Sequence, residues 1–199
     1  RSLLGIPYYS SLHIMLLKLP AILCDMACGC LLYKEATKRL HFSEIQSVCV
    51  ACAYLFQPAI ILNSSCWGQV DSVHTLVVIL MGLFLMDGKM LPAYAIYGIG
   101  VLLKPQTLIF TPVLLVGILD HVFLQDFSWR KFFYNLCGGL AVICGMLLLC
   151  VPFGLDAATS QYTSTLGSYE YAAVNAYNFW GLLGMNWVDQ NTIFLFLPC

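Results

Sequence analysis

Two short polar segments of this chain carry side chains that could do chemistry. Residues 67–72 have the sequence Trp-Gly-Gln-Val-Asp-Ser, and residues 104–106 have the sequence Lys-Pro-Gln. Both lie between apolar runs, where polar groups are costly unless they face a ligand or a water-filled cavity. Asp71 could accept a proton from an attacking hydroxyl. Lys104 could attract the phosphate of a leaving group, and this attraction is stronger in surroundings of low dielectric constant.

The spacing of these residues also permits simpler interpretations. Asp71 and Lys104 could merely neutralise each other across a helical hairpin. Asp71 and His74 could share a metal ion, but two ligands at helical spacing are weak evidence for a metal site. Residues 67–72 could also be a plain polar turn between two helices. Spacing alone does not distinguish these interpretations.

The composition is that of an integral membrane protein. Of the 199 residues, 60% are hydrophobic and 10% are charged, whereas a soluble domain has about 25% charged residues. The net charge of -1 and the nine scattered Lys and Arg residues argue against a nucleic-acid partner, because binding to a phosphate backbone needs clustered cations. We therefore predict an all-α fold, a polytopic transmembrane helical bundle, in a multi-pass protein of the cell membrane that contacts membrane lipids.

The elements that must position the polar segments are apolar runs of helical length. We predict about six membrane helices, the start of a seventh at 193–197, and a long outer loop over 152–191, which by its length is expected to be functional. The chain starts at Arg1 without Met and stops at Cys199 within an apolar run. We therefore expect residues 1–199 to be a single transmembrane domain, a fragment of a longer chain. The six predicted helices cover 12–33, 45–62, 73–86, 90–103, 107–123 and 132–151, and Pro58 is expected to kink the second of them or to end it early.

Basic residues predict how these helices are oriented. The expected cytoplasmic ends carry Lys34, Lys38, Arg39, Lys89, Arg130 and Lys131, whereas the expected outer ends carry only Arg1 and Lys104. Since cytoplasmic loops are enriched in Lys and Arg, both polar segments are predicted to lie at the outer face.

The two central helices are short for a membrane span. The runs 73–86 and 90–103 each contain 14 residues and reach about 21 Å, against a hydrocarbon thickness of about 30 Å. We therefore predict that the two polar segments lie in a polar cavity sunk into the membrane and open to the outer face. Local thinning or tilting of the bilayer is the alternative.

Two charged residues lie inside the first predicted helix. Lys18 and Asp25 are seven residues apart, or about 10 Å along the axis, which is too far for an easy direct ion pair. We expect Lys18 to extend toward the outer surface. Asp25 needs a partner from another helix, and we expect this partner to form a structural hydrogen bond with it.

Several blocks of the sequence resemble one family of membrane enzymes. Residues 63–112, with Trp-Gly-Gln-Val-Asp-Ser and Leu-Leu-Lys-Pro-Gln, look like the bacterial integral-membrane glycosyltransferases of the GT-C type. Within that class they are similar to the branch related to the second mannosyltransferase of glycosylphosphatidylinositol synthesis. Residues 17–25 resemble the family's helix after its first outer loop, and residues 171–184 resemble a later outer loop. The order and spacing of these blocks agree over most of the chain.

This resemblance implies an inverting mannosyltransferase-like enzyme. In such enzymes an acceptor hydroxyl, on a lipid or a glycan, attacks the anomeric carbon of a polyprenyl-phosphate sugar at the outer face, and the lipid phosphate leaves. The resemblance also implies a catalytic carboxylate in a first outer loop, which would precede Arg1. Asp71 would then be either the base or a positioning residue. No cofactor is implied with certainty, and a divalent metal ion remains an open alternative.

The candidate site combines these arguments. For the last three residues named below, a loop packed by its own aromatic side chains is an equal alternative. A secondary transporter with a polar site open to the outer face is the alternative function, although the sequence has no visible internal repeat. The catalytic candidate is Asp71, and the substrate-binding candidates are Trp67, Gln69, Lys104, Gln106, Tyr171, Asn175 and Asn178.

Overall fold

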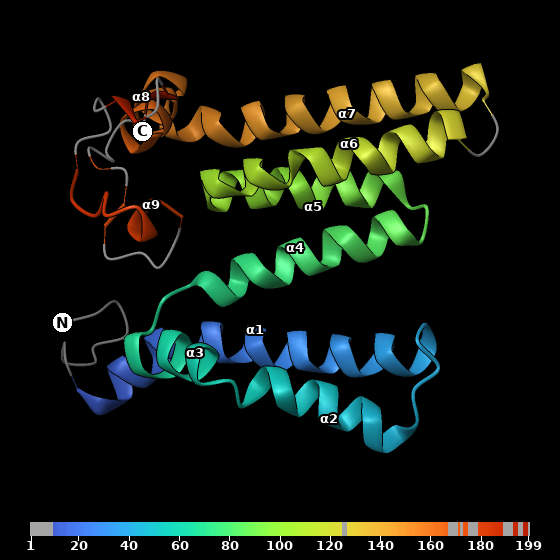
Figure 1. Ribbon diagram of the computed structural model, residues 1–199. Coiled ribbons are helices and arrows are strands. Elements are labelled where there is room, and N and C mark those ends of the chain that lie inside the picture. Colours follow the sequence, from blue (N-terminus) through green and yellow to red (C-terminus); the bar gives the residue numbers. More distant parts are fainter. Residues whose placement is uncertain are drawn as a thin grey trace. The chain divides into compact units, whose positions relative to one another are not determined.

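The computed structural model describes residues 10–124, 127–166, 171, 173–174, 179–188, 193–194 and 197–198. By its internal contacts the chain divides into two compact units, Arg1–Met146 and Leu147–Cys199. The described residues are predominantly helical (Figure 1), which confirms the predicted all-α class. β1 (Ile193–Phe194) and β2 (Leu197–Pro198) form a short antiparallel pair.

The helices of the first unit alternate in direction along the chain (Figure 1). α1 (Ser11–Lys38) packs against α2 (Glu44–Leu55) and α4 (Asp71–Met86), and α4 packs against α5 (Met90–Leu103). Successive helix ends therefore return to the same two sides of the unit. The remaining elements in chain order are α3 (Pro58–Ile60), the π-helical η1 (Ile61–Trp67), the 3-10 helix η2 (Pro105–Phe110), α6 (Thr111–Leu119), the π-helical η3 (Asp120–Leu124) and α7 (Trp129–Cys150).

Local sequence explains where the first helices begin and break. Ser10 caps α1 by accepting a hydrogen bond from the His13 backbone, and Ser43 forms a capping box with Gln46 at the start of α2. Proline disfavours helical geometry in the residue before it, and Gln57 is accordingly extended before Pro58. The predicted interruption at Pro58 is confirmed, because the two helical pieces on either side are bent by 43°.

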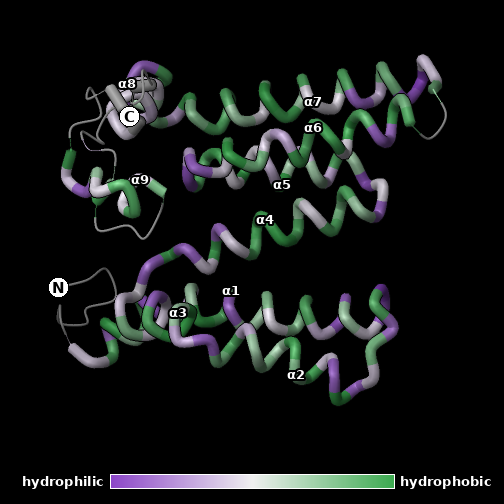
Figure 2. Tube along the Cα trace, viewed as in Figure 1, coloured by the Kyte–Doolittle hydropathy of each residue, from purple (hydrophilic) through white to green (hydrophobic). Residues whose placement is uncertain are grey.

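Three helical stretches in the described part of the chain are long and apolar enough to cross a membrane. They are Ser11–Lys38, Pro105–Leu124 and Trp129–Phe153, and the bent pair Glu44–Leu55 and Pro58–Trp67 would make a fourth. α4 and α5 are apolar but shorter. Each of the six predicted runs is therefore helical, whereas the number of spans stays a prediction. Figure 2 shows hydrophobic residues along the lengths of these helices and hydrophilic residues mainly near their ends.

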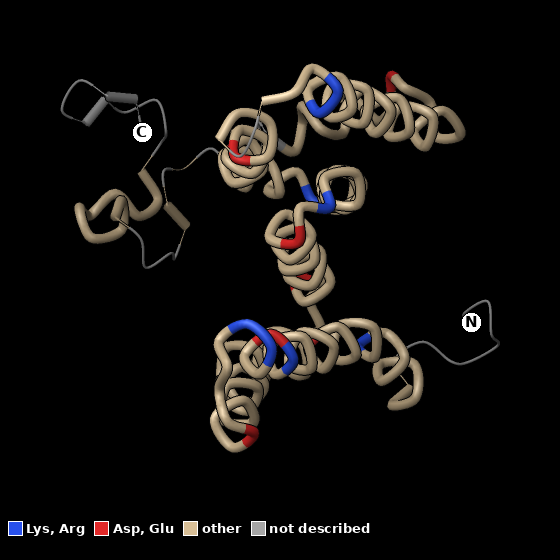
Figure 3. The backbone as a smooth tube through the Cα atoms, turned by 90° about the vertical axis from the view of Figure 1, so that its right-hand side faces the viewer, with Lys and Arg blue, Asp and Glu red and all other residues tan. Residues whose placement is uncertain are grey.

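An ion network joins two connections at the end of the unit where α1 and α4 finish. Arg39 pairs with Glu35 and with Asp87, and Asp87 also pairs with Lys89. Hydrogen bonds from Lys89, and to a smaller extent from Arg39, lower the pKa of Asp87. The hydrogen bonds that Arg39 makes with Glu35, and then with Asp87, raise the pKa of Arg39. Figure 3 looks onto this end and shows basic residues at several of its connections. The basic residues predicted to share one side of the membrane thus lie at one end of the unit.

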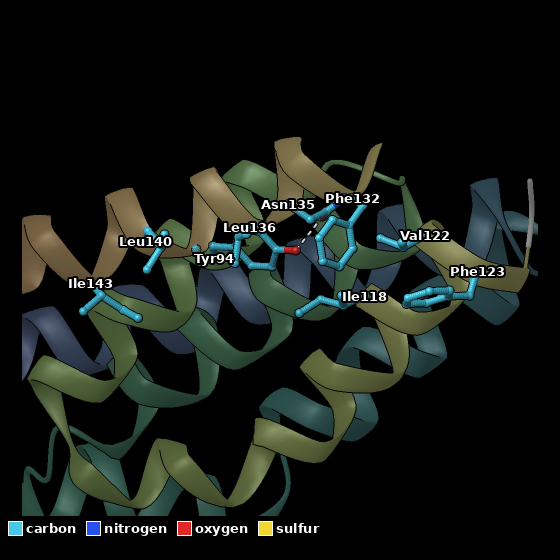
Figure 4. Close-up of a pocket in the computed structure, with 10 residues that line it drawn as sticks. Tyr94, Ile118, Val122, Phe123, Phe132, Asn135, Leu136, Leu140 and Ile143 are labelled. Atoms are coloured by element: carbon cyan, nitrogen blue, oxygen red, sulfur yellow. Dashed lines mark hydrogen bonds between the residues drawn. The ribbon is translucent and has the colours of Figure 1, made fainter. Parts of the chain in front are cut away.

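Close helix packing depends on small residues and on buried polar pairs. Gly98 of α5 faces Val142 and Met146, so that a β-carbon added there would lie 2.8 Å from Val142. The buried hydroxyl of Tyr94 donates a 2.5 Å hydrogen bond to Asn135 Oδ1 of α7. This bond lies beside an apolar cavity of about 290 Å³ between α5, α6 and α7 (Figure 4).

The hydrogen bond predicted for Asp25 is present. Its side chain is buried at 6% exposure, and the Tyr54 hydroxyl of α2 donates to its Oδ1 over 3.3 Å. A partner from a second helix therefore satisfies this carboxyl group, as the sequence predicts, and the contact helps to fix α2 against α1.

The predicted long loop over 152–191 is not confirmed, because the described part of this stretch contains helices. α8 (Leu155–Leu166) follows the short 3-10 helix η4 (Val151–Phe153), and α9 (Phe179–Leu182) comes later in the same stretch. The Ser and Thr content of α8 hides its helical tendency, because these residues usually favour turns. In α8 their hydroxyls instead bond carbonyls of the preceding turn, as Thr159 does with Leu155 and Thr163 with Thr159.

Candidate functional site

The two polar segments meet through the side chains of Asp71 and Lys104. Lys104 Nζ donates to Asp71 Oδ1, so the contact joins residues 33 positions apart. Asp71 is the first residue of α4 and Lys104 is the C-cap of α5. A carboxylate is favoured at a helix N-terminus and a cation at a C-terminus. Because α4 and α5 are antiparallel neighbours, these favoured positions fall side by side.

The ion pair remains accessible to a ligand. The side chains of Lys104 and Asp71 are 35% and 37% exposed. An ion pair with this exposure is screened by solvent and is worth about 1 kcal/mol or less. A phosphate could therefore compete for Lys104 at low cost.

Lys18 fixes the depth of the first segment relative to α1. Its Nζ donates to the backbone oxygens of Ser65 (2.7 Å) and Cys66 (2.9 Å) in η1. These are terminal carbonyls that lack partners within the helix, so the ammonium satisfies them. Lys18 lies seven residues after the start of α1 at Ser11, which is about 10 Å along the axis. The end of η1 therefore lies about two turns from the N-terminal end of α1.

The backbone turns sharply between η1 and α4. Gly68 has φ of 79°, a left-handed conformation that glycine adopts without steric cost. The backbone N–H groups of Gly68 and Gln69 both donate to the Asn63 carbonyl oxygen, at 2.9 and 3.0 Å. π-helical turns such as η1 recur at functional sites. This turn delivers Asp71 to the start of α4.

A second layer of hydrogen bonds supports Lys104. Thr107 is buried, and its hydroxyl donates to the Lys104 carbonyl oxygen over 2.8 Å. The same hydroxyl oxygen lies 2.9 Å from His74 Nε2. Both bonds form together only if His74 donates through Nε2, since a hydroxyl has one hydrogen. His74 thereby connects α4 to η2 beside the ion pair.

Gly100 allows η2 to fold back against α4 and α5. A β-carbon at this position would lie 2.9 Å from Thr107 Cγ2 and 3.0 Å from Val77 Cγ1. Real β-carbons hardly ever come so close, so any larger residue would push η2 outward. The position of Lys104 relative to Asp71 therefore depends on this glycine.

A small cavity of about 230 Å³ opens beside the ion pair. It is lined by Val70, Val73, His74, Leu103 and Lys104. Typical small-molecule sites are about 300–1,000 Å³. This cavity is thus smaller than a typical small-molecule site, and its apolar wall would lower the local dielectric constant around Lys104.

The other predicted site residues differ in exposure and in location. Trp67 is 76% exposed at the end of η1, Gln69 is half-buried, and Gln106 is exposed in η2. Tyr171 belongs to the second unit, where its ring lies 5.3 Å from that of Trp187, the kind of contact expected of a loop packed by its own aromatic rings. Asn175 and Asn178 lie outside the described residues.

Ser72 differs from its expected role in the polar cavity. It is 3% exposed, and its hydroxyl bonds the buried Ser64 hydroxyl over 2.6 Å. Because Ser72 is one position after Asp71 on α4, it points to a different side of the helix, toward η1. Its role in this structure is to hold η1 against α4.

Two supporting residues, Thr107 and Lys18, were absent from the site predicted from the sequence. Thr107 follows the Lys-Pro-Gln motif directly, and Pro105 is the first residue of η2. A 3-10 turn predicted at this proline would have placed Thr107 close to Lys104. Lys18 carries a visible signal, because a lysine within an apolar helix needs a polar partner.

Neither a metal-binding cluster in the described part of the chain nor a known relative adds a further assignment. Among the described residues, no three His, Cys, Asp or Glu side chains gather as a metal site. Comparison with protein-family models, with curated proteins and with solved structures found no match.

Proposed function

We propose that this chain is the core of a GT-C type integral-membrane glycosyltransferase that uses a polyprenyl-phosphate sugar donor. The observation that supports this most strongly is the contact between Asp71 and Lys104. It brings together the two motifs on which the family resemblance rests. The pairing also supplies a carboxylate and a phosphate-binding cation in one place, as transfer from a lipid phosphate requires.

In this proposal the donor phosphate exchanges with Asp71 as the partner of Lys104. The donor phosphate binds Lys104, and the Asp71 carboxylate is released toward the acceptor. Both side chains are about a third exposed, so the exchange requires no burial of an uncompensated charge. His74 and Thr107 keep the backbone at Lys104 in place during the exchange.

The transfer step then proceeds by inversion. The acceptor oxygen forms a bond to the anomeric carbon while the bond between that carbon and the phosphate oxygen breaks. Asp71 accepts the hydroxyl proton, and the lipid phosphate leaves with the electron pair, held by Lys104. If the first-outer-loop carboxylate that the family resemblance implies takes the proton, Asp71 instead positions Lys104 and the acceptor.

The proposed arrangement has six membrane segments and a recess at the outer face of the cell membrane. The alternating helices of the first unit and the ion network at one of its ends support a common cytoplasmic side for Arg39, Asp87 and Lys89. The shortness of α4 and α5 and the depth of η1 beside Lys18 support the recess.

The test is turnover of polyprenyl-phosphate-mannose by membranes that hold the full-length protein. Asp71→Asn and Lys104→Met should reduce sugar transfer at least tenfold with unchanged protein level. Asp87→Asn and Lys89→Met are matched controls, because they make the same changes in an ion pair at the opposite end of the same hairpin. We expect these controls to retain transfer.

The kinetic constants separate the two roles of Asp71. A base makes its contribution in the transition state, so its loss lowers kcat and kcat/KM together. A residue that only positions Lys104 chiefly raises KM for the donor. Full transfer in both Asp71→Asn and Lys104→Met would refute the proposed site, and donor turnover absent even from the unmodified protein would refute the proposed reaction.

A further inference from the structure

A second cavity lies at the other end of the first unit, between α5 and α7. It has a volume of about 480 Å³, and Leu91 of α5 forms one wall. The α7 side is formed by Arg130, Tyr134, Cys137, Gly138 and Ala141, with Phe133 beside them. These positions recur every three or four residues, so they follow one face of α7 for about 16 Å.

The cavity is an open groove on the surface of the unit, and small residues line its middle. Gly138 is buried, and a β-carbon there would lie 3.3 Å from Leu91 Cδ1. Cys137 and Ala141 are exposed. The aromatic rings of Phe133 and Tyr134 stand at 55% and 53% exposure. The result is an apolar groove along α7.

A cation stands at one end of this groove. Arg130 is the second residue of α7, and its side chain is exposed. Among the residues that the structure describes, no carboxylate pairs with Arg130. The helix N-terminus beside it adds a partial positive charge. A guanidinium binds phosphate oxygens in a bidentate manner.

A cation at one end of an apolar groove matches one class of ligand. A phospholipid carries a phosphate at the membrane surface and an acyl chain that runs inward from it. Arg130 would take the phosphate, and the groove from Phe133 to Ala141 would take the acyl chain. Lys89 and Arg39 lie at the ends of the neighbouring helices on the same side. Basic residues mark the cytoplasmic side, where anionic lipids concentrate and where basic pockets between membrane helices bind their head groups.

We propose that the groove between α5 and α7 is a binding site for one anionic phospholipid, with its phosphate at Arg130. The site is separate from Asp71 and Lys104, which lie at the opposite ends of their helices, and it does not depend on the proposed reaction. Its occupant holds α7 against α5 beside Gly138, where α7 offers only small side chains to Leu91 of α5.

Native mass spectrometry of the full chain, purified in mild detergent, tests this site. The probes are dioleoylphosphatidylglycerol, which is anionic, and dioleoylphosphatidylcholine, which has no net charge. We expect one tightly bound phosphatidylglycerol. Arg130→Gln should lower the preference for phosphatidylglycerol roughly fivefold, as expected for one basic residue near an anionic surface. Lys38→Gln is the matched control, because Lys38 is an exposed cation at the end of α1.

Two further measurements keep the test independent of any one variant. Ala141→Phe fills the groove and should lower retention of both lipids. In the unmodified chain, phosphatidylglycerol should slow alkylation of Cys137 more than phosphatidylcholine does, while the exposed Cys49 of α2 reacts equally with either lipid. The proposal is overturned if Arg130→Gln and Lys38→Gln have equal effects, or if neither Ala141→Phe nor Cys137 responds.

Discussion

Replacing Gly100 with alanine should disrupt the candidate site from within the helix that supports it. The added β-carbon would lie 2.9 Å from Thr107 Cγ2 and 3.0 Å from Val77 Cγ1. Thr107 is β-branched and therefore stiff in χ1. It cannot turn its methyl away without moving the hydroxyl that bonds the Lys104 carbonyl and His74.

The expected cost follows from these contacts. Overpacking a well-filled site costs about 1–3 kcal/mol, and losing both hydrogen bonds of the Thr107 hydroxyl costs about 2 kcal/mol. The higher helix propensity of alanine returns about 1 kcal/mol. Gly100→Ala should therefore lower the free energy of unfolding by about 2–4 kcal/mol. Gly82→Ala is the matched control, since Gly82 lies in α4 and a β-carbon there would meet nothing within 4 Å.

The assay is unfolding of the purified full chain in detergent by titration with sodium dodecyl sulfate, followed by far-ultraviolet circular dichroism. Combining Gly100→Ala with Thr107→Ser should restore part of the lost stability, because serine keeps the hydroxyl and lacks the clashing methyl. If Gly100→Ala matches Gly82→Ala, or if Thr107→Ser gives no rescue, η2 does not pack against Gly100 as described.

Two other perturbations test the ends of the same helices. Lys89 and then Arg39 lower the pKa of Asp87 in the folded protein. The ionised Asp87 side chain therefore stabilises the fold fully above its ordinary pKa of about 4. This stabilisation is lost as the pH falls through the lower pKa of the folded state. Asp87→Asn should remove this dependence, and equal acid titrations of both proteins would contradict the assignment. Tyr94→Phe removes the hydroxyl that bonds Asn135 and should cost about 0.5–1.5 kcal/mol; an unchanged unfolding midpoint would show that the bond contributes nothing.

Two ion pairs at opposite ends of α4 and α5 are useful for comparing function with stability. Asp71 and Lys104 lie beside a cavity, whereas Asp87 and Lys89 lie in a network with Arg39. The same substitutions can be made at both ends of one hairpin. A difference in sugar transfer between them therefore cannot come from the loss of a surface ion pair as such.

The sequence by itself determined the helical class and most helix positions. Apolar runs of 14 or more residues have few ways to satisfy their backbone groups other than a helix. Pro58 marked the interruption between α2 and α3, because proline removes a donor and constrains the preceding residue. The need of Asp25 for a partner from another helix also follows from sequence, since a carboxylate in an apolar run must be satisfied.

Other features could not be read from one-dimensional patterns. α8 lies in a stretch that was predicted as loop because it is rich in Tyr, Asn and Gly and has little apolar content. Only the bonds that the Ser and Thr hydroxyls of α8 make to preceding carbonyls reveal how these residues are accommodated in a helix. Ser72 was predicted to face a cavity because its neighbours are polar. Its direction depends on the turn at Gly68, which brings Ser64 to it.

The tertiary structure alone decided which groups form the site. The sequence predicts that Asp71 and Lys104 lie on one side of the membrane, but it does not predict which of the groups on that side are in contact. Their contact requires a tight turn at residues 87–89, antiparallel packing of two helices of nearly equal length, and a glycine at 100 that lets η2 fold back. These are relations between distant residues, and they are fixed by packing because close-packed interiors tolerate few arrangements of their backbones.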